Sequence, residues 1–335
     1  MVKQRCDMRR RIREFWIAGS IVAASTLSLP HPAIASPRLI SLAFNSQLRA
    51  PQQFGSDEFR KRLLALDDKP FVVDERGSGA LGSENAILAA ARSGAVDMAV
   101  ISGGVVSSVV PELGVFDIPF LFRDAAHAKA VAQGPVGAMI ATKFADKGLT
   151  LLALGKQGFR NVTNSRRPIR TPDDLKGLKI RVIPNDVYLM TFKALGAEVV
   201  PMEFPLVYAA LKDGRLDGQE NPLPTITNSR FYEVQKYLTL SGHFFAPIAF
   251  VANRAMFEQL DPSDQAALIT AAKAAAEVTW QAQLDGSNLE QLRNGGMEII
   301  EKVDRQPFVD AVKPLEGEFE KRFGKDLLVA IRSTP

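Results

Sequence analysis

Arg181 is the residue whose type and position most directly suggest chemistry. It lies in GLKIRVIPN (177–185), whose pattern predicts a short strand that ends in a Pro-Asn turn. In open α/β sheets, ligands bind beyond the carboxyl ends of the strands. A guanidinium placed there can hold a carboxylate through two parallel hydrogen bonds. The alternative is a surface arginine whose head extends into solvent, and the spacing alone leaves both open.

Two further polar residues could serve the same anion. Arg160 stands near the apolar Phe159 and Val162, so it is either a second anion ligand or the partner of an acidic residue elsewhere. Asn221 offers both a donor and an acceptor to a bound polar group. Its alternative role is to cap the turn before Pro222. The residues alone leave each pair of roles open.

The remaining binding candidates lie at the expected ends of strands and helices. Phe204 is either the wall of a pocket or a core residue, and Glu84 is either a ligand-binding acid or a first-turn helix acid. His243 belongs either to a polar network near a site or to the core. Asn45 follows the first predicted strand and likewise belongs either to a polar network near a site or to the core. Asn185 ends the turn after the strand that contains Arg181. We include all five as candidate ligand-binding residues.

The first 35 residues predict a secretory signal peptide. Arginines precede the apolar run FWIAGSIVAASTLSL, and Ala33 and Ala35 form an A-x-A cleavage site. The alternative, a membrane anchor, is disfavoured because the run is short. Met8 is an alternative start, and the arginine pairs leave the Sec and twin-arginine routes open. We therefore expect a periplasmic protein that begins at Ser36.

Removing this segment also removes the net charge. It holds six of the 41 Lys/Arg and two of the 37 Asp/Glu, which leaves 35 of each sign. The formal charge of +4 therefore gives no argument for nucleic acid binding, and none is expected.

Catalytic and metal-binding motifs are sparse. The chain has no G-x-S-x-G elbow, no P-loop and no H-E-x-x-H. A glycine-rich turn, GSGALG (77–82), has dinucleotide-motif spacing, but the expected export argues against a nicotinamide. Cys6 and His31 would leave with the signal peptide, and His127 and His243 are too few for a histidine zinc site. We expect no metal, no cofactor and no catalytic residue.

Alternating strands and helices must position these residues. Such alternation is typical of an α/β sheet with helices on both faces. Ser83 and Asp124 are the expected N-caps of two of the helices. Strands are predicted at 38–44, 71–75, 96–102, 149–154, 198–202 and 245–253, in addition to Arg181's. Helices are predicted at 56–66, 83–94, 124–148, 186–196 and 263–293.

A long, ordered string of motifs resembles one protein family. The runs at 158–185, 195–222 and 232–243, with GLKIRVIPN, DGRLDGQENP and LSGH, are similar to the DctP-type solute-binding proteins. These serve tripartite ATP-independent periplasmic (TRAP) transporters. GALGSENAILAAARSGAVDMAVIS (79–102) and PELGVFDIPFLF (111–122) agree in order, so the resemblance covers about residues 38 to 330.

The resemblance implies a two-lobe α/β clamp of the periplasmic-binding-protein type. Hinge strands and a long lobe-spanning helix would join the lobes, which close on a ligand. After the signal peptide (1–35), we expect lobe one at 36–157 and lobe two at 158–246. Residues 247–286 would return to lobe one with the long helix, and 287–335 would form C-terminal helices packing on lobe two.

The resemblance also implies roles for six candidates. Arg181 matches the arginine that pairs with the ligand carboxylate. The others match two further ligand contacts (Arg160 and Asn221), an aromatic wall (Phe204) and a polar network (Glu84 and His243).

The sequence departs from the family pattern at two places. Leu206 stands where many members have Glu, which affects the rim of the pocket. Ser102, Gly103 and Gly104 are small where some relatives carry a larger polar group, so the pocket would admit an acid longer than four carbons.

The expected function is capture of a carboxylate-containing organic acid and its delivery to the membrane subunits of a TRAP permease. One alternative is a sensory receptor that presents its ligand to a signalling partner. A weaker one is an exported enzyme that uses Glu84 or Glu220 as general acid or base. A monomer is expected. Sugar acids, dicarboxylates, keto acids and aromatic acids all remain open as ligands.

Overall fold

Nine strands in the described part of the chain form one mixed sheet. The computed structural model describes residues 38–335, except 46–49, 67–70, 78 and 283–284. Met1–Ala35 and Ser36–Pro335 are separate units, and the described residues belong to the second. The strands are β1 (Arg38–Phe44), β2 (Phe71–Arg76), β3 (Met98–Ser102), β4 (Leu149–Asn164), β5 (Lys179–Val182), β6 (Glu198–Pro201), β7 (Gly218–Pro222), β8 (Tyr237–Asn253) and β9 (Glu298–Ile300).

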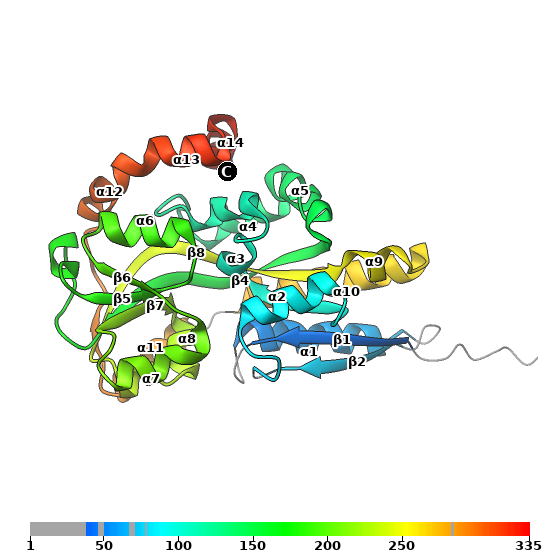
Figure 1. Ribbon diagram of the computed structural model, residues 1–335, viewed down its shortest axis with the longest axis horizontal. Coiled ribbons are helices and arrows are strands. Elements are labelled where there is room, and N and C mark those ends of the chain that lie inside the picture. Colours follow the sequence, from blue (N-terminus) through cyan, green and yellow to red (C-terminus); the bar gives the residue numbers. More distant parts are fainter. Residues whose placement is uncertain (1–37, 46–49, 67–70, 78, 283–284) are drawn as a thin grey trace, which may run out of the picture. The chain divides into compact units, whose positions relative to one another are not determined.

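Helices cover both faces of this sheet (Figure 1). The α-helices are α1 (Pro51–Leu64), α2 (Glu84–Ser93), α3 (Gly103–Val106), α4 (Ala125–Gln133), α5 (Pro135–Thr142), α6 (Asp186–Ala194), α7 (Val207–Lys212), α8 (Leu223–Asn228), α9 (Arg254–Glu258), α10 (Pro262–Gln281), α11 (Asp285–Asn294), α12 (Gln306–Val312), α13 (Glu316–Phe323) and α14 (Lys325–Ser333). The 3-10 helices are η1 (Pro111–Asp117), η2 (Ala145–Lys147), η3 (Pro172–Leu175), η4 (Phe204–Leu206), η5 (Phe231–Glu233) and η6 (Lys313–Leu315).

Two long strands hold the halves of the sheet together. The order is β2-β1-β3-β8-β4-β7-β5-β6, with β9 on β8. β4 and β8 pair in antiparallel fashion from Leu149 opposite Asn253 to Asn164 opposite Tyr237, so they run through both halves. The pairing shifts register between Lys156 and Gly158, and irregularities of this kind bend a strand. β4 and β8 are therefore the expected hinge strands of a two-lobe α/β clamp.

The long helix of the clamp lies along one of these hinge strands. α10 contacts α1 and β4, and its alanine-rich face is buried against them. Trp280 near its end donates a hydrogen bond from Nε1 to the carbonyl of Leu154, 2.9 Å away. The helix is thereby fixed to β4 just before that strand enters the second half of the sheet.

Several predicted elements agree in place but differ in length. Ser83 and Asp124 cap α2 and α4 as expected, since their side chains accept hydrogen bonds from the amides of Ala86 and His127. β4 and β8 are far longer than the strands predicted from their apolar cores. The helix predicted at 124–148 is interrupted at Gly134, because Pro135 begins a new helix.

The helix predicted at 263–293 is wrong as a single element. α10 ends at Gln281, and Ala282 has extended dihedral angles of −60° and 117°. A separate helix, α11, follows from Asp285.

The C-terminal helices contact both halves of the sheet. α11 contacts α8 and α12 contacts α6, whereas α14 contacts α5. The guanidinium of Arg123 donates to the carbonyl of Thr334 at 2.8 Å. Figure 1 shows α12 beside α6 and the end of the chain nearer α5. α14 thus contacts an element of the predicted lobe one, and the lobe boundaries, with the packing of 287–335 on lobe two, remain predictions.

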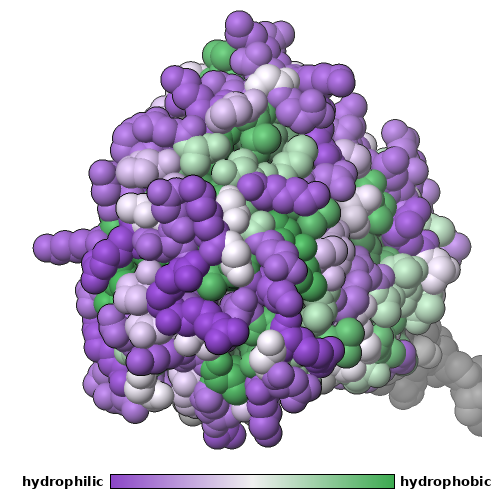
Figure 2. All heavy atoms as spheres, turned by 60° about the vertical axis from the view of Figure 1, so that its left-hand side comes forward, coloured by the Kyte–Doolittle hydropathy of each residue, from purple (hydrophilic) through white to green (hydrophobic). Residues whose placement is uncertain are grey.

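Hydrophilic residues cover most of the face seen in Figure 2, with smaller apolar areas between them. Among the described residues, no helix has the length and apolarity that a membrane span requires. The predicted signal peptide, 1–35, lies outside the described residues.

Candidate ligand-binding site

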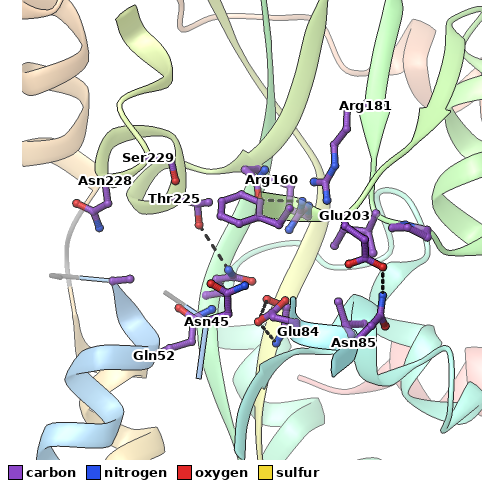
Figure 3. Close-up of a pocket in the computed structure, with 18 residues that line it drawn as sticks. Asn45, Gln52, Glu84, Asn85, Arg160, Arg181, Glu203, Thr225, Asn228 and Ser229 are labelled. Atoms are coloured by element: carbon purple, nitrogen blue, oxygen red, sulfur yellow. Dashed lines mark hydrogen bonds between the residues drawn. The ribbon is translucent and has the colours of Figure 1, made fainter. Parts of the chain in front are cut away.

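Six of the eight predicted site residues line one pocket. They are Asn45, Glu84, Arg160, Arg181, Phe204 and Asn221. The rest of the lining is largely polar and consists of Ala50, Gln52, Asn85, Ser102, Val105, Gln157, Ile183, Pro184, Glu203, Thr225, Asn228 and Ser229. Figure 3 shows that these side chains converge from helices and strands of both halves of the sheet.

Arg181 is buried and only partly hydrogen-bonded. It lies near the carboxyl end of β5 and is 2% exposed, which excludes the surface alternative. Its Nε donates to the carbonyl of Met202 at 2.8 Å, and its guanidinium carbon lies 5.8 Å from the ring centre of Phe204. Among the described residues, its Nη1 has no hydrogen-bond partner. Burial lowers the pKa of Arg181 to about 10, so the side chain is charged at neutral pH.

Arg160 forms the ion pair that the sequence left as an alternative, and it lines the pocket as well. Its Nε lies 2.5 Å from Glu220 Oε2, and both side chains are almost fully buried. Burial acts to raise the pKa of Glu220, but the charge and hydrogen bonds of Arg160, together with those of His243, outweigh it and the pKa is lowered. The positive charge of Arg160 is therefore already matched within the protein.

Asn221 is held in place by the same ion pair. Its Oδ1 accepts a hydrogen bond from Arg160 Nη2 at 3.1 Å, and its Nδ2 donates to Gln219 Oε1 at 2.5 Å. The cap of the following helix is Pro222 rather than Asn221. The capping alternative for Asn221 is therefore excluded.

Glu84 and Asn45 enter the pocket from the first half of the sheet. Glu84 is the first residue of α2, and its Oε1 accepts hydrogen bonds from the amide and hydroxyl of Ser102, both at 3.0 Å. Burial raises the pKa of Glu84. Asn45 Nδ2 donates to the carbonyl of Gly82 at 2.9 Å, which ties the end of β1 to the turn before α2.

His243 and Asn185 lie outside the pocket lining, and their contact with a ligand stays a prediction. His243 lies behind the pocket, with Nε2 3.2 Å from Glu220 Oε2, and burial lowers its pKa. Asn185 caps α6 and donates to Ser107 Oγ at 2.7 Å and to Asp117 Oδ2 at 3.2 Å. Both residues therefore organise neighbours of the site.

Sequence reasoning missed several polar lining residues. Asn85 and Glu203 directly follow or precede identified candidates, and Asn85 Nδ2 donates to Glu203 Oε1 at 2.6 Å across the pocket (Figure 3). Gln52 and Gln157 are buried, and neither Oε1 has a hydrogen-bond partner in the described part of the chain. Glutamines near the start of a helix or within a strand carry no special sequence signal, so no pattern could have found these two.

The small residues after β3 are explained by packing. A Cβ on Gly103 would lie 2.6 Å from a side-chain atom of Pro247, and one on Gly104 would lie 2.8 Å from Tyr188 Oη. Only Ser102 of the three lines the pocket. Packing therefore explains the two glycines, only Ser102 bears on the size of the pocket, and the prediction of a longer acid stays a prediction.

Comparisons with known proteins identify the family of the chain. Residues 57–322 match the family of bacterial extracellular solute-binding proteins, family 7 (DctP). A solute-binding protein of Verminephrobacter eiseniae is 40% identical over 88% of this chain and 87% of its own length. A 2,3-diketo-L-gulonate-binding periplasmic protein of Escherichia coli is 37% identical over 75% of this chain and 78% of its own.

A solved structure agrees in fold as well as in sequence. A TRAP periplasmic solute-binding protein of a Polaromonas species, bound to D-erythronate, superposes with a TM-score of 0.86 and is 33% identical. The match covers 89% of this chain and 99% of that one. The chain therefore belongs to family 7 of the bacterial extracellular solute-binding proteins.

Proposed function

We propose that the protein captures a carboxylate-containing organic acid in this pocket and delivers it to a TRAP permease. One observation carries the proposal: Arg181 is buried and charged, and its Nη1 has no partner among the described residues. A buried charged donor that lacks a partner is costly, and a ligand carboxylate would supply the acceptor. Arg160 cannot play this part alone because Glu220 already matches its charge.

The similar proteins support an acid as the ligand. The Escherichia coli protein is named for 2,3-diketo-L-gulonate, and the Polaromonas protein is bound to D-erythronate. Both ligands carry a carboxylate. In this chain Phe204 would cover one face of the bound group beside Arg181, while Asn221 would offer it a fixed amide.

The remaining parts of the proposal follow from the family. The protein would be exported through cleavage after Ala35, act in the periplasm as a monomer and carry no catalytic activity. Arg160 engages both carboxylate oxygens of Glu220, which argues against Glu220 as a general acid or base, and Glu84 Oε1 accepts two hydrogen bonds from Ser102. A sensory role would use the same clamp, and the partner that recognises the closed form would distinguish it from transport.

Thermal-shift screening of the chain from Ser36 against a library of organic acids tests the proposal. A ligand that binds only the folded state raises the melting temperature according to RT ln(1 + [L]/Kd). We expect a clear shift with at least one acid and its loss in Arg181→Ala, since truncating a buried charge pair costs roughly 2–5 kcal/mol of binding. Arg181→Lys should also bind poorly, because an ammonium lacks the planar fork.

Arg215→Ala is the matched control. Arg215 is more than half exposed and pairs only with its neighbour Asp213 among the described residues, so its removal should leave the shift intact. A shift that persists in Arg181→Ala, or that appears only with neutral or cationic solutes, would overturn the proposal.

A further inference from the structure

Three amides with unsatisfied atoms line the same pocket as Arg181. Gln52 and Gln157 are both more than nine-tenths buried, and their Oε1 atoms have no hydrogen-bond partner among the described residues. The same holds for Nδ2 of the half-buried Asn228. In Figure 3 Gln52 and Asn228 lie on the opposite side of the pocket from Arg181. This amide cluster (Gln52, Gln157 and Asn228) offers both acceptors and a donor to a bound molecule.

The neighbouring hydroxyl does not satisfy these groups. Gln157 Nε2 lies 3.5 Å from Thr225 Oγ1, which is the limit of a hydrogen bond and leaves the carbonyl oxygen of the same amide unbonded. A carbonyl oxygen can only accept a hydrogen bond, so the two glutamine oxygens would be satisfied by O–H or N–H groups of the ligand. A carboxylate has no such hydrogen and cannot serve them.

The charges of the lining also act against a second carboxylate. Glu84 and Glu203 both line the pocket, and Glu203 shares its Oε1 with Asn85. Of the two arginines, Arg160 is neutralised by Glu220, which leaves Arg181 as the cation in the described lining that can take a ligand anion. A second carboxylate would therefore meet two acidic side chains and two carbonyl oxygens without a free cation to offset them.

Hydroxyl groups satisfy all of these conditions. Each hydroxyl donates one hydrogen and accepts at its lone pairs, so it can bond a glutamine oxygen and the Asn228 amide at once. Hydroxyls can also donate to the carboxylates of Glu84 and Glu203 without adding charge. Resting on the proposed function, we propose that the ligand is a polyhydroxylated monocarboxylate, held by its carboxylate at Arg181 and by its hydroxyls at the amide cluster.

Calorimetric titration with four sodium salts tests this class on the chain from Ser36. D-gluconate and D-erythronate carry one carboxylate and several hydroxyls, whereas adipate and succinate match their carbon numbers with two carboxylates and no hydroxyl. We expect the better hydroxy acid to bind at least about tenfold more tightly than the better dicarboxylate, because a site built for hydroxyls leaves buried groups unpaired without them. Tighter binding of either dicarboxylate would overturn the proposal.

Two substitutions test the amide cluster directly. Gln157→Met and Gln52→Met keep the length of the side chain and remove its carbonyl. Each should weaken binding of the better hydroxy acid by about fivefold or more, since one hydrogen bond is lost. Binding of hexanoate, which has no hydroxyl, should not weaken. Gln291→Met, at an exposed position of α11, is the matched control, and melting curves without ligand check that the variants fold.

The outcomes separate this inference from the proposed function. If a dicarboxylate binds more tightly than the hydroxy acids, or if both glutamine variants bind the hydroxy acid normally, the proposed ligand class is wrong. Loss of binding in Arg181→Ala would still support a receptor for an organic acid. If none of the four acids binds, the ligand class is wrong, and the screen of the acid library still decides the proposed function. If binding survives Arg181→Ala, both proposals fall.

Discussion

At the scale of single residues, two buried arginines in one pocket have opposite energetic roles. Arg160 donates to both carboxylate oxygens of Glu220 and to its carbonyl, at 2.5 to 2.8 Å. Arg181 has a carbonyl and an aromatic ring as neighbours and one nitrogen without a partner in the described structure. The first charge has a direct ion-pair partner whether or not a ligand is present, whereas the second is stabilised by the charges of Glu220, Glu203 and Glu84 and has no ion-pair partner in the described structure.

Substitution of each arginine by methionine should separate these roles in the ligand-free protein. Arg160→Met leaves Glu220 buried without its counter-charge and should lower the free energy of unfolding by roughly 3–5 kcal/mol. Arg181→Met removes an incompletely bonded charge and fills its space, so unfolding should require the same or slightly more free energy. Urea unfolding measures both, and a large loss of stability in Arg181→Met would contradict this account.

At the scale of elements, α6 is joined to the segment after β3 by a buried polar cluster. Asp117, at the end of η1, accepts hydrogen bonds from Ser107 Oγ at 2.8 Å and from Asn185 Nδ2 and Tyr188 Oη at 3.2 Å. Burial raises the pKa of Asp117 to about 6, although these donors and Arg160 act in the opposite direction. Elements from both predicted lobes therefore meet at a carboxyl group whose pKa is raised to about 6.

This cluster predicts a pH dependence of stability. The unfolded chain loses the Asp117 proton near its ordinary pKa of 3.8, while the folded protein keeps it to about 6. The folded state then binds more protons between these values, so its stability should fall by up to roughly 3 kcal/mol as the pH rises from about 4 to about 6. The contribution should be constant above that range.

Asp117→Asn has no proton to lose and serves as the comparison. Unfolding free energies of both proteins, measured from pH 4 to 7, should differ in slope between pH 4 and 6 and run parallel above pH 6. Parallel curves over the whole range would show that Asp117 is not the group responsible.

The sequence predicted the elements well where their signals are local. Ser83 and Asp124 mark helix starts because a short polar side chain next to an apolar run is a local pattern. The full lengths of β4 and β8 could not be predicted, because polar residues such as Arg160 and His243 interrupt their apolar runs and find partners only in the folded sheet. The end of α10 at Gln281 could not be predicted, because the sequence pattern typical of a helix continues on both sides of it.

The site could be predicted in part for the same reason. Arg181 and Phe204, which line the pocket, could be predicted as site residues because they stand in motifs that resemble the family. Arg181 also lies near the carboxyl end of a predicted strand. Gln52 and Gln157 were missed because their importance arises from burial without a partner, which depends on side chains that are distant in sequence.

At the scale of the whole folded unit, Ser36–Pro335, the pocket is bridged by a direct contact. Asn85 on α2 and Glu203 before η4 both line the pocket and meet at 2.6 Å. They belong to the two predicted lobes, so this hydrogen bond would form only when the lobes close. We therefore expect that this hydrogen bond, in addition to the contacts of the ligand, contributes to the free energy of closure.

A double-mutant cycle tests this contribution. Asn85→Ala and Glu203→Ala should each weaken acid binding, and the double variant should bind about 1 kcal/mol better than the sum of the single effects predicts. Asn294→Ala, at the exposed end of α11, is the control and should not change affinity. Additive effects in the cycle would mean that the two residues act separately on the ligand.

The two long strands, β4 and β8, make each half of the sheet depend on the other. Because β4 leads out of the first half of the sheet and β8 leads back into it, each half is completed by chain that belongs in part to the other. A gene fragment encoding residues 36–157 would lack β8, the strand that lies between β3 and β4, and would leave an open edge in the middle of its sheet. We therefore expect that neither predicted lobe folds from one continuous gene fragment, and that the two were inherited as a single piece.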